Sequence, residues 1–366
     1  MKSKDRYDII IENAIKDWGN SMDNENKRDL WEIPKYSKSE ISKAGSIIAD
    51  PFSTKEDRDH ALIILNNWRA AHAYPLQVMC NNLRLRNPNA IVVQRLKRLD
   101  SITNKIERFP NMSLYRMQDL GGCRVIVDTI DQVYEAVNRY KNSRIRHILR
   151  REYDYIQNPK DSGYRSYHMV YQFQSDKRET YNKNMLIEIQ FRTKLQHIWA
   201  TAVEMMGIYT KSQLKASIGD KDILRFFVLT SSVFANMENM PICPNTNNCQ
   251  NLLTEEIKEI NNKINIISKL SALSVAISKH TDDNLKHKGY YLLCLSYSEN
   301  ILNIDRFSTS NIKAVTVAYN KLEALNDPNI DVVLVSATSF DTLKAAYPNY
   351  FADISQFIDI MKRILA

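Results

Sequence analysis

Alternating apolar and polar residues predict a group of strands in the central part of the chain. Residues 123–127, 166–173 and 185–191 are rich in β-branched and aromatic side chains, as strands are. The third strand has one apolar and one polar face. Its apolar residues are Ile187, Ile189 and Phe191, and its polar residues are Glu188, Gln190 and Arg192. The polar face therefore lies against water or lines a site.

Apolar residues at helical spacing predict helices around these strands. The expected helices span 57–73, 76–85, 102–108, 112–119, 131–140 and 194–206, with Ser101 as N-cap of the third and a Gly121-Gly122 hinge after the fourth. Because helices and strands alternate irregularly, the sequence predicts an α+β fold with a mixed β-sheet flanked by helices.

Both ends of the chain differ in composition and apolar periodicity from this central part. Residues 1–60 are polar with broken periodicity, which predicts a helical N-terminal extension. Residues 241–248 are rich in Pro and Asn, as linkers are. A small α+β C-terminal module is expected beyond them, with a helix at 252–278, strands at 290–296 and 331–336, and helices at 312–325 and 353–365. The predicted domains are thus 1–60, 61–240 and 241–366.

The chain is basic, and the excess charge is concentrated. The net charge is +8 over 366 residues. Residues 84–108 hold seven Lys/Arg against two acids, and residues 139–165 hold eight against three, which indicates a polyanionic partner. We find no apolar run of membrane-spanning length and no signal-peptide pattern, and apart from Cys243 and Cys249 no cysteine pair has the spacing of metal ligands. We therefore expect a cytoplasmic protein with no membrane and no DNA partner; a homo-oligomer remains open.

A loop at 154–168 combines cations and aromatic rings around one glycine, which suits an anionic, planar ligand. The chain has eight glycines and neither of the glycine-rich phosphate-binding motifs. Side chains must therefore neutralise any bound phosphates. The candidate cations are Arg95, Lys97, Lys105, Arg124, Lys160, Arg165 and Arg192.

Two carboxylates accompany these cations. Asp119 precedes the Gly-Gly pair, and Glu188 lies in the polar face of its strand. Acids among phosphate-binding cations are typical of Mg²⁺-assisted phosphoryl transfer. The alternative for Glu188 is an exposed cross-strand salt bridge with Arg192.

Four ordered blocks of residues resemble the synthetase domain of RelA/SpoT-type pyrophosphokinases. The blocks are Arg95-x-Lys97 with Ser101-Ile102 and Lys105; Asp119-Leu120-Gly121-Gly122-x-Arg124; Pro159-Lys160-x-x-Gly163-Tyr164-x-Ser166-x-His168; and Glu188-Ile189-Gln190-Phe191-Arg192-Thr193 with His197 and Trp199-Ala200. The resemblance covers residues 61–239. It implies a nucleotidyltransferase-like synthetase domain that moves the β,γ-pyrophosphate of ATP to the 3′-hydroxyl of GDP or GTP.

The resemblance also implies a role for each residue. Asp119 and Glu188 would be catalytic and bind Mg²⁺, with Glu188 as metal ligand or as base. ATP would be bound by Arg95, Lys97, Lys105 and Arg124. The acceptor would be bound by Tyr164, Lys160, Arg165, His168, Gln190 and Arg192, with Tyr164 stacking on its base.

One departure leaves the acceptor open. Members of this family usually carry Asn before the Gly-Tyr pair, whereas this chain has Ser162, and a serine hydroxyl offers fewer hydrogen bonds than an amide. The basic runs and the C-terminal module also suit transfer to the 3′ end of tRNA, as in toxic relatives. A non-catalytic module that binds nucleotides or RNA is the third alternative. No His-Asp dipeptide of the associated hydrolase domain occurs, so we do not expect product hydrolysis.

Overall fold

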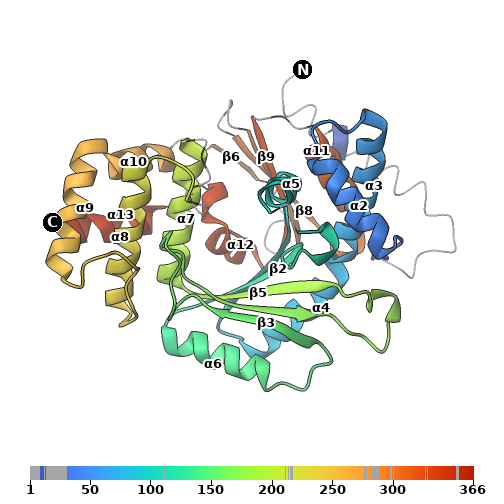
Figure 1. Cartoon of the computed structure of the whole chain (residues 1–366), viewed down its shortest axis with the longest axis horizontal. Helices are drawn as coiled ribbons and strands as arrows, with labels where there is room; N and C mark the ends of the chain where they lie inside the picture. Colours follow the sequence, from blue (N-terminus) through green and yellow to red (C-terminus); the bar gives the residue numbers. More distant parts are fainter. Residues whose placement is uncertain are drawn as a thin grey trace.

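The computed structural model describes residues 9–11, 13, 31–109, 112–210, 212, 214, 217–275, 278–281, 288–296, 299, 301–325, 327, 329–351 and 354–366 (Figure 1). A nine-stranded sheet runs through this part of the chain. In spatial order its strands are β3 (Ile148–Asp154), β4 (Tyr167–Gln172), β5 (Leu186–Thr193), β2 (Gly121–Val127), β1 (Ile91–Leu96), β9 (Ile330–Ala337), β7 (Gly289–Ser296), β8 (Ile301–Phe307) and β6 (Ser278–Thr281).

The pairing confirms the mixed sheet and the α+β class. Strands β2 and β5 are parallel, as are β6 and β8, and the other neighbouring pairs are antiparallel. Parallel neighbours need a crossover, and α6 lies on the chain between β2 and β5.

Helices cover both faces of the sheet (Figure 1). The longer helices are α2 (Lys38–Ala49), α3 (Lys55–Ala71), α4 (Ala73–Arg86), α5 (Leu99–Arg108), α6 (Ile130–Lys141), α7 (Lys194–Tyr209), α8 (Lys221–Met237), α9 (Gln250–Ile264), α10 (Ile266–Val275), α11 (Ile312–Ala324), α12 (Phe340–Ala346) and α13 (Ser355–Leu365). Helices α4 and α6 lie below the sheet in this view, and α5, α7 and α12 lie above it.

The predicted two-faced strand is correct. Ile187, Ile189 and Phe191 of β5 are buried in the main hydrophobic cluster, which also holds residues of α2, α3, α4 and α6. Burial of those apolar side chains fixes the register of β5, because a slip by one residue would turn Glu188 and Arg192 into the core.

Several predicted elements need correction. Residues 112–119 form a short 3₁₀ turn, Leu114–Arg116, and not a helix. Helix α5 begins at Leu99 with Arg98 as N-cap, so the N-cap prediction for Ser101 was wrong. The predicted helix at 252–278 is divided at Asn265, whose φ of 53° is left-handed and ends α9.

Other strands escaped prediction. The sequence did not indicate β1, β3 or β8, and the Gly121-Gly122 hinge is the start of β2. Strand β3 is exposed along most of its length, so it lacks the apolar alternation that marks a half-buried strand.

The C-terminal strands continue the sheet of the central region. Strand β9 pairs with β1 through Gln94 opposite Ser336 and Arg95 opposite Val335. The division into 1–60, 61–240 and 241–366 stays a prediction, but a hydrogen-bonded ladder crosses its last boundary. Much of the N-terminal extension, residues 1–8, 12 and 14–30, lies outside the described residues. Among the helices described, none is both long and apolar enough to cross a membrane.

Candidate active site

The candidate site lies on the polar face of β5 and β2, beneath α7 and α12. The parallel pairing of these strands places Gly122 opposite Glu188 and Arg124 opposite Gln190. On the other side of β2, Arg95 of β1 pairs with Gly122. The strand register therefore brings Arg95, Arg124 and Glu188 onto neighbouring strands, although they are distant in the sequence.

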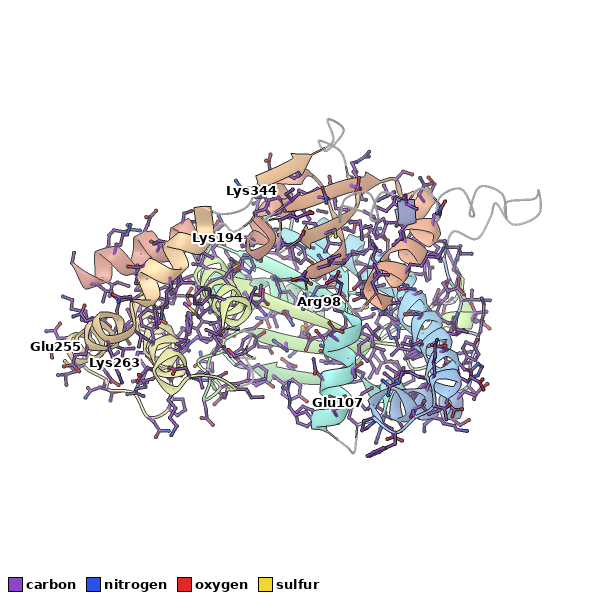
Figure 2. All side chains as sticks on the ribbon, turned by 90° about the horizontal axis from the view of Figure 1, so that it is seen from above. Arg98, Glu107, Lys194, Glu255, Lys263 and Lys344 are labelled. Atoms are coloured by element: carbon purple, nitrogen blue, oxygen red, sulfur yellow. The ribbon has the colours of Figure 1, made fainter. Side chains whose placement is uncertain are left out.

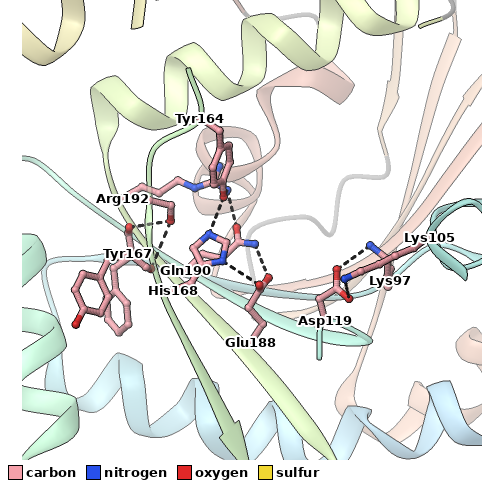
Figure 3. A network of polar contacts seen from close by, with 11 residues as sticks. Lys97, Lys105, Asp119, Tyr164, Tyr167, His168, Glu188, Gln190 and Arg192 are labelled. Atoms are coloured by element: carbon pink, nitrogen blue, oxygen red, sulfur yellow. Dashed lines mark hydrogen bonds and ion pairs between the residues drawn. The ribbon is translucent and has the colours of Figure 1, made fainter. Parts of the chain in front are cut away.

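Asp119 lies just before β2 and is bound by two lysines. Its Oδ2 accepts a hydrogen bond from Nζ of Lys97 at 2.9 Å, and its Oδ1 accepts one from Nζ of Lys105 at 2.8 Å (Figure 3). Burial alone would raise the pKa of Asp119, but the two ammonium groups hold it well below its usual range. Asp119 is therefore an ionised carboxylate with a cation on each oxygen.

Glu188 belongs to a second polar network in Figure 3. Its Oε1 is 3.0 Å from Nδ1 of His168, and its Oε2 accepts a hydrogen bond from Nε2 of Gln190 at 2.7 Å. Burial raises the pKa of Glu188, yet His168 outweighs it and the net pKa is lowered. Burial likewise lowers the pKa of His168, but Tyr164 and Glu188 leave it raised.

Tyr164 extends this network to Arg192. Its hydroxyl is 2.9 Å from Nε2 of His168 and accepts a hydrogen bond from Nη2 of Arg192 at 2.5 Å. The same nitrogen donates to Oε1 of Gln190 at 2.6 Å. The preceding residue, Gly163, has a φ of 83°, and a Cβ there would lie 3.0 Å from Trp199 and Ser231. Glycine therefore permits the turn that directs Tyr164 into the site.

The two carboxylates lie on the same side of the sheet. Figure 3 shows both carboxyl groups pointing to the same side of the ribbon, and the charge of Asp119 acts to raise the pKa of Glu188. The sheet therefore does not separate the carboxyl groups of Asp119 and Glu188.

Beside Glu188, buried donors gather without acceptors. Within the described residues, Nε and Nη1 of Arg192 and Nε of Arg124 are buried donors that make no hydrogen bond. Burial, together with the nearby Arg192, lowers the pKa of Arg124 to about 10. Donors that converge without acceptors suit an anion with several oxygens.

The C-terminal region borders this cluster. Nη1 of Arg124 donates to the carbonyl of Ala346 at 3.1 Å, and its guanidinium lies 5.8 Å from the ring centre of Tyr347. His197 Nε2 is 3.1 Å from the carbonyl of Ala345. Sequence reasoning missed these contacts, because no local signal connects residues 345–347 with a strand 220 residues earlier.

Lys160 and Arg165 have different surroundings. The ammonium of Lys160 lies 4.3 Å from the ring centre of Tyr155 and 5.4 Å from that of Tyr164, so it borders the network. Arg165 is 4% exposed, and its guanidinium donates to Ser231, to the carbonyl of Ile156 and to the sulfur of Cys243. Those bonds give Arg165 a structural environment, whereas its acceptor-binding role stays a prediction.

The acids fit a hard divalent cation bound together with substrate. In the described part of the chain no cluster of three or more His, Cys, Asp or Glu side chains is arranged as a metal site. Mg²⁺, however, is usually held by one or two carboxylates plus substrate phosphates. The pair Asp119 and Glu188 supplies that number of ligands.

Part of the chain is similar to a described protein family. Residues 94–214 match the family described as a region found in RelA / SpoT proteins. GTP pyrophosphokinase YjbM of Bacillus subtilis (strain 168) is 35% identical over 119 residues, 31% of this chain and 54% of the relative. GTP pyrophosphokinase YwaC of the same organism is 32% identical over 128 residues, 33% of this chain and 59% of the relative. The chain thus spans little more than half the length of these curated relatives.

Two solved structures also show similarity to part of this chain. A GTP pyrophosphokinase family protein from Streptococcus pneumoniae is 25% identical, with a TM-score of 0.40, over 51% of this chain and 91% of that one. Small alarmone synthetase 1 from Bacillus subtilis, bound to pppGpp, is 23% identical, with a TM-score of 0.37, over 52% and 95%. Residues 94–214 of this chain match a region found in RelA / SpoT proteins, and residues 1–93 and 215–366 lie outside that match.

Proposed function

We propose that this chain is an ATP-dependent 3′-pyrophosphokinase. In the proposed reaction, the 3′-hydroxyl oxygen of a guanine nucleotide, GDP or GTP, attacks the β-phosphorus of ATP. The bond from that phosphorus to the oxygen bridging the α-phosphorus breaks, and AMP leaves while the acceptor gains a pyrophosphate. The observation that carries the proposal is the placement of Asp119 and Glu188 on one face of the sheet among five cations (Arg95, Lys97, Lys105, Arg124 and Arg192).

The cations divide into two groups, one at Asp119 and one near Glu188. Lys97 and Lys105 lie at Asp119, whereas Arg124 and Arg192 carry the buried donors without acceptors. A bound phosphate would satisfy those donors, and each charge-assisted hydrogen bond contributes roughly 1.5–3 kcal/mol. These contacts stabilise charge on the transferred group, which is the main catalytic device in phosphoryl transfer.

Asp119 and Glu188 are the proposed Mg²⁺ ligands. The metal would supply charge neutralisation on the transferred pyrophosphate. The chain's own residues orient the acids: Lys97 and Lys105 fix Asp119, and His168 with Gln190 fixes Glu188. We also assign Glu188 as the general base that accepts the proton of the attacking hydroxyl.

A second acceptor, the 3′ end of tRNA, is favoured by the environment of Tyr164. Tyr164 is 9% exposed, and Lys160 and Arg192 lie 5.4 and 5.1 Å from its ring centre. The burial of Tyr164 and these two cations leave little of the ring for a guanine base to stack on. Strand β3 beside it has exposed arginines, Arg150 and Arg151, of a kind that contacts nucleic-acid backbones.

The test is transfer from γ-³²P-labelled ATP with Mg²⁺ to GDP, GTP or bulk tRNA, using the whole chain. Label on GDP or GTP with release of AMP supports the main proposal, and label on RNA alone supports the second acceptor. Transfer to none of the three, while ATP still binds, leaves a non-catalytic binding module. Glu188→Gln is the matched control, because the amide keeps the shape of the side chain and removes its charge.

A further inference from the structure

We propose that Glu323 on α11 is a positioning residue for the segment that binds the ATP phosphates. This inference rests on the proposed function. The segment is residues 94–99, which carry Arg95 and Lys97 and lead into α5. Glu323 lies 224 residues from Leu99 in the sequence, outside the part that matches the RelA/SpoT family.

The carboxylate of Glu323 holds both ends of the connection between β1 and α5. Its Oε1 accepts a hydrogen bond from the backbone nitrogen of Leu99 at 3.0 Å. Its Oε2 accepts one from Nη1 of Arg69 at 2.5 Å, and the same nitrogen donates to the carbonyl of Lys97 at 3.2 Å. Glu323 therefore binds position 99 directly and position 97 through one guanidinium.

Glu323 also caps the helix that carries Lys105. Helix α5 starts at Leu99, and its N-cap residue, Arg98, makes no side-chain cap hydrogen bond. The first nitrogens of a helix have no partner within the helix, and a negative charge there is stabilising. The C-terminal region thus supplies the cap that the local sequence lacks. Figure 2 shows α5 from Arg98 to Glu107, lying over the strands of the sheet.

Both lysines at Asp119 depend on this connection. The backbone nitrogen of Lys97 donates to the carbonyl of Leu120 at 2.8 Å, so its peptide is fixed on one side by the segment after Asp119 and on the other by Arg69. Lys105 lies in the second turn of α5. If residues 97–99 shift, the ammonium groups of Lys97 and Lys105 move relative to Asp119. ATP binding requires these groups to keep their positions.

The pair of Arg69 and Glu323 is buried, so the contact is well defined. The side chains are 1% and 9% exposed. Burial lowers the pKa of Arg69, but Glu323 and Tyr319 raise it, and the net pKa is raised. Further contacts of this cluster run from Tyr319 to Glu323 at 2.9 Å and from Arg69 to Asn320 and Asn66.

Asn320 provides the matched control. It lies on the same helix as Glu323, and its Oδ1 accepts a hydrogen bond from Nη2 of Arg69 at 2.5 Å. The hydrogen bond described for its side chain goes to Arg69 and not to residues 97–99. Asn320→Ala therefore weakens the attachment of α11 to α3 and leaves the direct cap on Leu99 in place.

The experiment compares Glu323→Gln and Asn320→Ala in the whole chain. We expect Glu323→Gln to raise the Kd of a non-hydrolysable ATP analogue and the KM for ATP about tenfold, as for one lost charged contact, with the acceptor KM and kcat within about twofold. Asn320→Ala should change none of these beyond about twofold. Glu323→Asp, which keeps the carboxylate, should recover part of the ATP affinity.

Some outcomes overturn the inference. Unchanged ATP affinity in a folded Glu323→Gln protein, or equal losses in Glu323→Gln and Asn320→Ala, would reduce Glu323 to a docking contact. Where the Gln variant does not fold, Glu323→Asp takes its place, and ATP affinity equal to wild type then refutes the role. ATP binding is read without turnover, so the failure of pyrophosphate transfer would refute the proposed function and leave this readout intact.

Discussion

Replacing Glu188 with Gln tests the proposed chemistry most directly. The change removes the charge from a carboxylate whose Oε1 faces His168 at 3.0 Å and whose Oε2 accepts from Gln190 at 2.7 Å. A glutamine can keep one oxygen acceptor toward His168, so the pair falls from a charged to a neutral hydrogen bond. Charged hydrogen bonds contribute roughly 1.5–3 kcal/mol and neutral ones roughly 0.5–1.5, which gives a loss in unfolding free energy of about 1–2 kcal/mol.

The loss in turnover should be far larger than the loss in stability. Loss of a proton-accepting group costs typically about 10²–10⁴ in rate, and loss of a metal-binding charge adds to that. We expect Glu188→Gln to reduce kcat at least about 10³-fold, measured as AMP release and label transfer with saturating ATP. Its circular-dichroism spectrum and its thermal transition should remain those of a folded protein. Turnover within tenfold of wild type would mean that the catalytic acid is placed wrongly.

Three further perturbations test two parts of the site and one buried histidine. Lys105→Met leaves Asp119 with Lys97 as its charged partner, and we expect kcat/KM for ATP to fall about 10- to 150-fold; an unchanged KM for ATP would contradict the donor role. Tyr164→Ala removes the hydroxyl that joins His168 to Arg192, so the acceptor KM should rise more than the Kd for ATP, and equal losses would argue against acceptor binding. Burial lowers the pKa of His72 to about 4, so below pH 6.5 the unfolded state binds the extra proton. The contribution of His72 to the unfolding free energy should therefore drop as pH falls from 6.5 to 4, by on the order of 3 kcal/mol, and His72→Gln should reduce the pH slope by that amount.

The sequence was sufficient where local pattern and burial agree. Strand β5 was predicted because its apolar residues alternate, and the structure buries those residues against the helices on one face. Helix α6 was predicted at 131–140 and spans Ile130–Lys141, with a capping box from Thr129 to Gln132 that defines its start.

Elements that depend on tertiary contacts could not be predicted from the local sequence. The first nitrogen of α5 donates to Glu323, which is distant in the sequence. The local sequence therefore indicated Ser101 as the N-cap. Strand β1 pairs on both sides, with β2 and β9. Its sequence has an apolar run followed by two adjacent polar residues, so apolar and polar positions do not alternate. Of the candidate site, Asp119 and Glu188 were proposed from their positions before the Gly-Gly pair and on the polar face of a strand, and their roles stay predictions. The contact of Arg124 with residues 346–347 depends on pairing between β1 and β9 that no short motif records.

The adjacent glycines of β2 separate the requirements of the fold from those of the site. Gly121 belongs to the fold, because a Cβ there would lie 2.8 Å from Cδ1 of the buried Ile187. Gly122 pairs with Arg95 on one side and Glu188 on the other, and the nearest atom to its added Cβ is the carbonyl oxygen of Arg95 at 4.0 Å.

A side chain at position 122 would therefore find room in the protein and would fill the space between the two acids and Arg95. Gly122→Val should keep the unfolding temperature at or above that of wild type, since valine favours strands, while ATP binding and transfer are lost. Gly121→Val should instead lower the unfolding temperature strongly, because the core side chains around it must shift. The two variants differ by one position in one strand, so propensity and expression effects are shared. If Gly122→Val binds ATP as wild type does, the space above Gly122 is not where the donor phosphates lie, and the assignment of Arg95 to the donor fails with it.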